Sequence, residues 1–186
     1  AMILQKGGLV AFPTDTLYAL GADAFNEKSI LRVFEVKNRS LEMALPVLIA
    51  DCDTMSDLAT DLTQEIWDLS DKFWPGPLTI VVKKSPSVSN ILTAGQDSLA
   101  IRMPDHSLAL GIISESCKAL TGTSANIFGG PDPISPIIVR DQIGDKIEMV
   151  IDGGTCPIGG ASTILDLTSE CPIILRQGVL PSSDLK

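Results

Sequence analysis

Basic residues are scarce in this sequence. Lysine and arginine together number 14, against 23 aspartate and glutamate residues, which gives a formal charge of −9 at pH 7 and a pI of about 4.5. Binding to a nucleic-acid backbone usually needs a broad basic face, so this balance disfavours a dedicated nucleic-acid-binding protein. A local basic pocket is compatible with the net charge and would suit a small anionic ligand.

Cysteine, histidine and long apolar runs are scarce as well. The four cysteines are widely spaced, form no Cys-x-x-Cys pair and have only His106 to join them, which disfavours a zinc site. We interpret them as reduced thiols. No run of about 18 apolar residues is present, and residues 1–6 are too short for the apolar part of a signal peptide. These absences predict a cytoplasmic protein without a membrane partner.

The common catalytic and nucleotide-binding signatures are missing. The sequence has no Gly-x-x-x-x-Gly-Lys-Ser/Thr phosphate loop, no Gly-x-Gly-x-x-Gly after the first predicted strand and no Gly-x-Ser-x-Gly elbow. The only histidine follows Pro104-Asp105, where the start of a helix is the simpler interpretation. A serine-hydrolase triad is therefore disfavoured, and any nucleotide site must be of another kind.

Strand-like and helix-like patterns alternate along the 186 residues without a linker, a repeat or a shift in composition. A chain of this length, with 45% hydrophobic residues, buries roughly 70% of its unfolded surface in one compact domain. We therefore predict a single α/β domain over residues 1–186 with a mixed sheet. Apolar runs predict strands at 8–13, 78–83, 99–103, 149–151, 162–167 and 172–176, with a further run at 45–50, and helical spacing covers 26–39, 62–73, 108–118 and 139–144.

Polar residues stand at the ends of several of these elements. In an open α/β sheet, ligands bind beyond the strand ends, where loops converge on one crevice. Taken singly, these residues also fit turns, caps or charges that complement a helix dipole. Arg102 is harder to explain in this way, because Ile101 and Met103 flank it and a buried guanidinium needs a carboxylate from the protein or from a ligand. The residues concerned are Thr14, Asp15, Thr16, Lys37, Arg39, Arg102, Ser124, Asn126 and Arg176.

Seven ordered segments together resemble the YrdC family of threonylcarbamoyl-AMP synthases over nearly the whole chain. The resemblance implies a YrdC-like fold, which is a twisted mixed β-sheet with flanking helices and a concave ligand-binding face. The second domain of longer relatives is not expected, because the chain ends soon after the last segment. The segments are FPTDTLYALGADA from Phe12, KNR from Lys37, WPGPLT from Trp74, IRMPDH from Ile101, TSAN from Thr123, ASTILDL from Ala161 and RQG from Arg176.

The resemblance also implies an activity. The family converts L-threonine, bicarbonate or CO2, and ATP into threonylcarbamoyl-AMP and pyrophosphate, which serves threonylcarbamoyladenosine synthesis in tRNA. Mg²⁺ is expected with the ATP, and a tRNA or a tRNA-modifying protein is a further candidate partner. By motif, Thr16, Arg102 and Ser162 would hold threonine. The residues implied for the nucleotide are Lys37, Arg39, Ser98, Ser124, Asn126 and Arg176, with Lys37 and Arg39 as the catalytic cations.

Lys37 and Arg39 are two positions apart, which on a continuous helix would point them about 200° from each other. Their convergence on one phosphate therefore predicts that the helix unwinds near Asn38. No metal ligand is assigned, because Asp15 and Asp152 fit turns and caps as well as magnesium binding.

The sequence departs from the family pattern in three places. Ala19 stands where the family usually has glycine, Met43-Ala44 replaces a polar residue and a proline, and Leu48 stands where many relatives have histidine. Three hypotheses are therefore carried forward: an active synthase, an RNA-binding module with a concave surface, and a degenerate relative that binds a nucleotide or carbamoyl ligand without synthase activity. We favour the active synthase, because the chemistry needs cations and positioning rather than a side-chain nucleophile.

Overall fold

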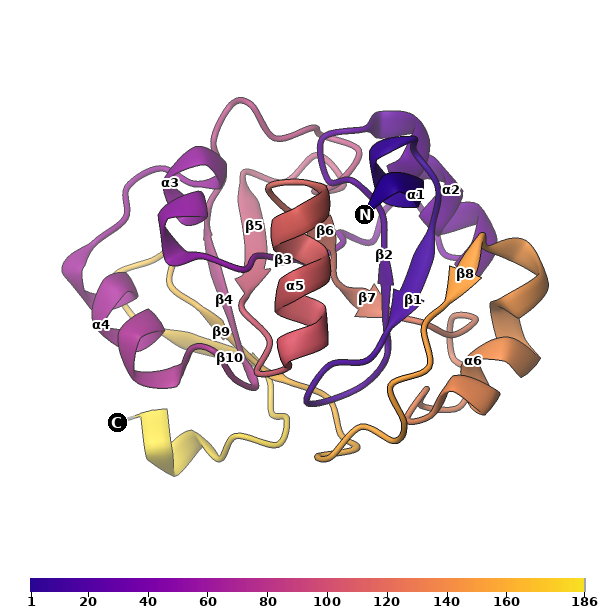
Figure 1. Ribbon diagram of the computed structural model, residues 1–186. Coiled ribbons are helices and arrows are strands. Elements are labelled where there is room, and N and C mark those ends of the chain that lie inside the picture. Colours follow the sequence, from indigo (N-terminus) through magenta and orange to yellow (C-terminus); the bar gives the residue numbers. More distant parts are fainter. Residues whose placement is uncertain (186) are drawn as a thin grey trace.

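The computed structural model describes residues 1–185 and has a mixed α/β architecture (Figure 1), which confirms the predicted fold class. The strands form two mixed sheets, with the orders β7-β2-β1-β8 and β10-β9-β4-β5-β3-β6. The first sheet contains β1 (Val10–Phe12), β2 (Ala19–Gly21), β7 (Thr123–Ser124) and β8 (Met149–Val150). The second contains β3 (Val47–Leu48), β4 (Leu78–Lys83), β5 (Ser98–Arg102), β6 (Leu120–Thr121), β9 (Thr163–Asp166) and β10 (Ile173–Arg176).

Helices surround both sheets. Figure 1 shows α1, α2 and α6 around the first sheet, α3 and α4 beside the second, and α5 across the middle of the molecule. The α-helices are α1 (Met2–Gln5), α2 (Glu27–Lys37), α3 (Met55–Leu58), α4 (Gln64–Phe73), α5 (Ser107–Ser116) and α6 (Pro136–Ile143). Single 3₁₀ turns occur at η1 (Cys52–Thr54), η2 (Gly144–Lys146) and η3 (Ser182–Leu185).

The strands are divided between two sheets, whereas the sequence pattern predicted one. The predicted strands at 78–83 and 99–103 correspond closely to β4 and β5, but β2, β6 and β7 were not predicted. Each of these three is only two or three residues long, so it is too short to show an alternating pattern. β6 and β7 are defined by antiparallel pairing with strands that are distant in sequence, and local sequence does not reveal such pairing. β2 pairs with the nearby β1 as well as with the distant β7.

Side chains along β4 and β5 alternate between the hydrophobic core and the opposite, open face of the second sheet. Leu78, Ile80 and Val82 of β4 are fully buried in the main hydrophobic cluster. Neighbouring Val81 instead lines a cavity, and so does Ala100, its register partner on β5. The two-residue period of a strand therefore directs one set of side chains into the core and the other towards the cavity.

Helix α2 carries a signal at each end that explains its bounds. Asn26 caps the start, since its side-chain oxygen accepts hydrogen bonds from the backbone of Lys28 at 3.1 Å and Ser29 at 3.3 Å. At the other end, Asn38 adopts the left-handed conformation with φ 51° and ψ 46°. The predicted unwinding at Asn38 is confirmed, and it turns the chain at Arg39 away from the helix axis.

Helix α5 covers a second, smaller hydrophobic cluster. Its Ala109 and Ile113 are fully buried against Phe12 of the first sheet and against Leu48 and Leu120 of the second. This packing joins the two sheets on the side away from the main core. No helix within residues 1–185 has the length and apolar character needed to cross a membrane.

Candidate functional site

The two sheets and the loops beside them enclose a cavity of about 420 Å³. It is lined by the connection between β1 and β2 from Thr14 to Tyr18, by Ala19 at the start of β2, by the open face of β4, β5 and β9, and by the segment after α2. Seven of the nine site residues predicted from the sequence lie on its wall. These are Thr16, Arg39, Ser98, Arg102, Ser124, Ser162 and Arg176.

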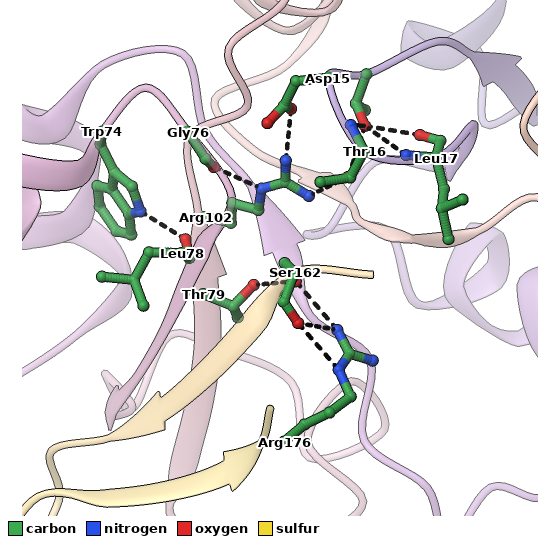
Figure 2. A network of polar contacts seen from close by, with 11 residues as sticks. Asp15, Thr16, Leu17, Trp74, Gly76, Leu78, Thr79, Arg102, Ser162 and Arg176 are labelled. Atoms are coloured by element: carbon green, nitrogen blue, oxygen red, sulfur yellow. Dashed lines mark hydrogen bonds and ion pairs between the residues drawn. The ribbon is translucent and has the colours of Figure 1, made fainter. Parts of the chain in front are cut away.

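Arg102 is the most strongly held of these residues. Its Nη2 forms an ion pair with Asp15 Oδ1 at 2.5 Å, Nη1 donates to Thr16 Oγ1 at 2.6 Å and Nε donates to the Gly76 carbonyl at 2.8 Å (Figure 2). Burial lowers the pKa of Arg102, and the Asp15 carboxylate opposes that shift. A carboxylate partner from the protein or from a ligand was predicted for Arg102, and Asp15 of the protein is that partner. A guanidinium has five N–H donors, so two remain for a ligand.

The Asp15–Arg102 ion pair also connects the two sheets. Asp15 follows β1 in the first sheet, whereas Arg102 ends β5 in the second. A turn built on Thr14 fixes this connection, since Thr14 Oγ1 accepts from the backbone nitrogens of Thr16 at 3.1 Å and Leu17 at 3.2 Å. The turn interpretation of Thr14 is therefore correct, and the turn brings Thr16 to the cavity wall.

Ser162 is positioned by two neighbouring side chains. Its hydroxyl lies 2.8 Å from Thr79 Oγ1, and Arg176 Nη2 donates both to Ser162 Oγ at 3.0 Å and to its carbonyl at 2.8 Å (Figure 2). The neighbouring Gly178 has no room for a side chain, because an added Cβ would lie 2.3 Å from the Ser162 carbonyl carbon. This contact explains why the segment RQG ends in glycine.

Arg39 reaches the cavity from the segment that follows α2. Its Nη2 donates to the Ala44 carbonyl at 2.8 Å, and its guanidinium carbon lies 5.9 Å from the centre of the Phe128 ring. Burial lowers the pKa of Arg39. These contacts orient the side chain while part of it stays on the cavity wall.

Lys37 and Asn126 do not line the cavity in the part of the chain that the structure describes. The Lys37 ammonium is buried behind the wall and donates to the Ser124 carbonyl at 2.5 Å, the Asn126 carbonyl at 2.7 Å and Asn126 Oδ1 at 3.1 Å. Asn126 Nδ2 donates to the carbonyls of Gly130 and Pro131. The family resemblance implied a nucleotide contact for both residues, whereas in this structure their polar side-chain atoms form hydrogen bonds with the protein.

Arginines are concentrated on the cavity wall, although the protein has a net charge of −9. Three arginines and two aspartates line the cavity, a formal charge of 3 − 2 = +1 for the lining residues, and Arg102 is in addition paired with Asp15. Burial lowers the pKa of Arg176, and Asp132 opposes that shift. Sequence reasoning missed both aspartates. They are Asp132 and Asp166; Asp166 lies within the ASTILDL segment of the family resemblance but was not assigned a role, and Asp132 lies in none of the seven segments.

The departures from the family pattern have structural explanations in two places. Ala19 is the first residue of β2, an inner strand of the first sheet. A strand backbone is accessible to alanine, so this position does not need the conformational freedom of glycine. Leu48 is the register partner of Arg102 and also lies on the cavity wall. Gly122 leaves room for it, because a Cβ there would lie 2.7 Å from Leu48 Cγ. An apolar side chain is therefore built into the wall beside Arg102.

Comparison with known proteins agrees with this arrangement. Residues 2–178 match the model of the Sua5/YciO/YrdC family, which carries the description "Telomere recombination". The chain belongs to this family. Among curated members, it is 42% identical to the threonylcarbamoyl-AMP synthase of Pyrococcus abyssi over 186 residues, covering 100% of this chain and 55% of that protein. It is 37% identical to the Bacillus subtilis synthase over 187 residues, covering 100% of this chain and 54% of that protein.

A solved structure of the family gives the same fold. The crystal structure of P. abyssi Sua5 complexed with L-threonine matches with a TM-score of 0.97 and 42% identity, covering 99% of this chain and 54% of that one. The chain thus spans about half the length of the curated relatives it matches. The Sua5/YciO/YrdC fold is therefore established for the region that carries the cavity.

Proposed function

We propose that this chain is an L-threonylcarbamoyl-AMP synthase. The observation that carries the proposal is the convergence of Arg39, Arg102 and Arg176, from three distant parts of the sequence, on one cavity. Relatives that bear this enzyme's name are 37–42% identical to the chain, and one related structure holds L-threonine. The proposal treats residues 1–186 as one YrdC-like domain.

The proposed reaction joins three small molecules in two steps. The threonine amine first combines with CO2, supplied directly or from bicarbonate, and loses a proton to form a carbamate. A carbamate oxygen then attacks the α-phosphorus of ATP, forming the acyl phosphate bond of threonylcarbamoyl-AMP as the bond to pyrophosphate breaks. The reactants are both anionic, so catalysis depends on cations and on alignment, and no side-chain nucleophile is required.

Arg102, Thr16 and Ser162 form the threonine subsite in this proposal. The two free N–H donors of Arg102 suit a carboxylate, because a guanidinium binds carboxylates in a bidentate manner. Thr16 and Ser162 are fixed by Arg102 and by Thr79 respectively, so their hydroxyls are oriented before a ligand arrives. Such preorganisation lowers the cost of ordering the site upon binding.

Arg39 and Arg176 stabilise the phosphates in this proposal, and Ser98 and Ser124 supply further polar contacts on the wall. Magnesium enters as part of the substrate MgATP. A magnesium ion bound to a nucleotide needs only one or two protein carboxylates, and Asp132, which lines the same cavity as Arg176, fits that requirement. The product would serve threonylcarbamoyladenosine synthesis in the cytoplasm, with a tRNA or a tRNA-modifying protein as the downstream partner.

The proposal is tested by incubating the purified chain with MgATP, bicarbonate and L-threonine and measuring pyrophosphate release. A matched reaction without threonine is the control. Threonine-dependent release is the expected result. Nucleotide binding without release would identify a degenerate relative, and salt-sensitive tRNA binding without turnover would favour an RNA-binding module.

A further inference from the structure

Lys37 is the one predicted catalytic cation that is buried away from the cavity wall. It is the last residue of α2, and its side chain is 1% exposed. A lysine is almost never fully buried unless its charge is compensated. Its position therefore calls for a role other than the ligand contact assigned from the sequence.

The hydrogen-bonding capacity of Lys37 is fully used by the protein. An ammonium has three N–H donors, and three acceptors lie within 3.1 Å of Nζ: the carbonyls of Ser124 and Asn126 and the side-chain oxygen of Asn126. A phosphate would have to displace one of these buried oxygens, which would then lose its partner. The described contacts thus leave no donor for a ligand.

The acceptors of Lys37 belong to a segment that builds the cavity wall. Ser124 lines the cavity, and its hydroxyl donates to Asn126 Oδ1 at 2.7 Å. Asn126 Nδ2 then donates to the carbonyls of Gly130 at 3.0 Å and Pro131 at 3.2 Å, next to the wall residue Asp132. We call residues 124–132 the 124–132 loop.

The end of α2 is attached to the same loop by its backbone. The Phe128 nitrogen donates to the Lys37 carbonyl at 2.8 Å, and the Phe128 ring lies near Arg39. Asn38 in the left-handed conformation then turns the chain so that Arg39 reaches the wall. One buried residue is therefore connected to both parts of the proposed nucleotide subsite, Ser124 and Arg39.

We propose that Lys37 is a positioning residue, whose ammonium fixes the 124–132 loop against the end of α2 so that Ser124 and Arg39 meet the same nucleotide. The role rests on the proposed function, since it concerns the ATP subsite of that reaction. Lys37 acts through the loop and does not touch the phosphates. The threonine subsite lies apart from these contacts, because Lys37 makes no hydrogen bond to Thr16, Arg102 or Ser162 within residues 1–185.

The test compares Lys37→Met with Arg39→Met. We expect Lys37→Met to raise KM for ATP about tenfold, because a misplaced binding group costs about that much or more, while KM for threonine changes less than twofold. The salt dependence of ATP binding distinguishes a positioning residue from a residue that contacts the phosphates directly, since salt screens a direct phosphate contact. Arg39→Met is expected to flatten this dependence, whereas Lys37→Met leaves it close to that of the unsubstituted chain.

Asn126→Ala provides a second variant in case Lys37→Met folds poorly. It removes one acceptor of Lys37 and is expected to raise KM for ATP without changing the salt dependence, and the double variant should lose less than the sum of the single losses. A flattened salt dependence in Lys37→Met, or additive losses, would overturn the positioning role. Failure of the unsubstituted chain to bind ATP would instead overturn the proposed function, and this inference with it.

Discussion

Arg102 is the central residue of the proposed threonine subsite. It ends β5 in the second sheet, its side chain reaches residues that follow β1 of the first, and it is held by three protein acceptors and keeps two N–H donors for a ligand. Its partner Asp15 neutralises the charge that burial would otherwise make costly. A carboxylate ligand therefore meets a guanidinium whose orientation is fixed in advance.

We expect Arg102→Ala to lower kcat/KM for threonine at least tenfold, equivalent to about 1.4 kcal/mol, because the carboxylate loses its main partner. Arg140→Ala is the matched control, since Arg140 is half exposed and lies 3.6 Å from Asp152, outside the cavity wall. The control should retain full activity. Unchanged threonine kinetics in a folded Arg102→Ala protein would contradict the assignment.

Lys37 makes the stability of the protein depend on pH. Burial, with a smaller contribution from Arg39, lowers the pKa of Lys37 to about 7, from an ordinary value of about 10.5. Between these pH values the unfolded chain binds more protons than the folded one, so the free energy of unfolding gains a contribution that rises with pH. Below about pH 7 both states are protonated and the contribution is flat.

This linkage is measured by urea unfolding of the unsubstituted chain and Lys37→Met at pH 7, 8 and 9. The difference in the free energy of unfolding should shift progressively in favour of the unsubstituted chain as the pH rises. The variant removes the titrating group, so other ionisable residues cancel in the difference. A difference that stays constant across the series would show that the pKa of Lys37 is not lowered.

At the scale of elements, β9 and β10 position Ser162 and Arg176 through a close backbone contact at Gly178. We expect Gly178→Ala to destabilise the fold by about 1–3 kcal/mol, because the new Cβ would lie 2.4 Å from the Ala161 carbonyl oxygen. Threonine affinity should fall as well, since Ser162 must move.

The control for this change is Gly111→Ala in α5, where no atom lies within 4 Å of the added Cβ. Alanine should stabilise that helix by up to about 1 kcal/mol. Thermal unfolding and threonine titration of both variants check the prediction. Equal behaviour of the two alanine variants would rule out the contact at Gly178 as the cause.

Local patterns predicted the elements that have local causes. The cap at Asn26 and the apolar spacing of α2 mark its start, and the six-residue run of β4 appears with its observed bounds. Strands β6 and β7 depend on partners far along the chain, so no local signal shows them. Strand β2 pairs with the nearby β1, but its three residues are too few to show an alternating pattern. The division into two sheets follows from those pairings, and for that reason it too was not predicted.

The same distinction holds for the candidate site. Arg102 was recognisable because a charge inside an apolar strand requires a partner, although the sequence did not show that Asp15 is that partner. Lys37 was assigned to the nucleotide through the KNR segment of the family resemblance, and its three acceptors come from residues 87 and 89 positions away. Which polar atoms are already satisfied depends on the tertiary structure.

At the scale of the whole molecule, the protein combines an acidic overall charge with a cavity lined by three arginines. Each guanidinium comes from a different part of the chain: the segment after α2, the end of β5 and the end of β10. Two sheets joined by the Asp15–Arg102 pair bring them together. The proposed function therefore requires that the three arginines bind threonine and ATP in the cavity at the same time.

A crystal structure of the chain with L-threonine and a non-hydrolysable MgATP analogue tests this dependence most directly. The account predicts both ligands in the one cavity, with the threonine carboxylate on Arg102 and the phosphates on Arg39 and Arg176. Threonine bound elsewhere, or phosphates that leave both Arg39 and Arg176 uncontacted, would contradict it.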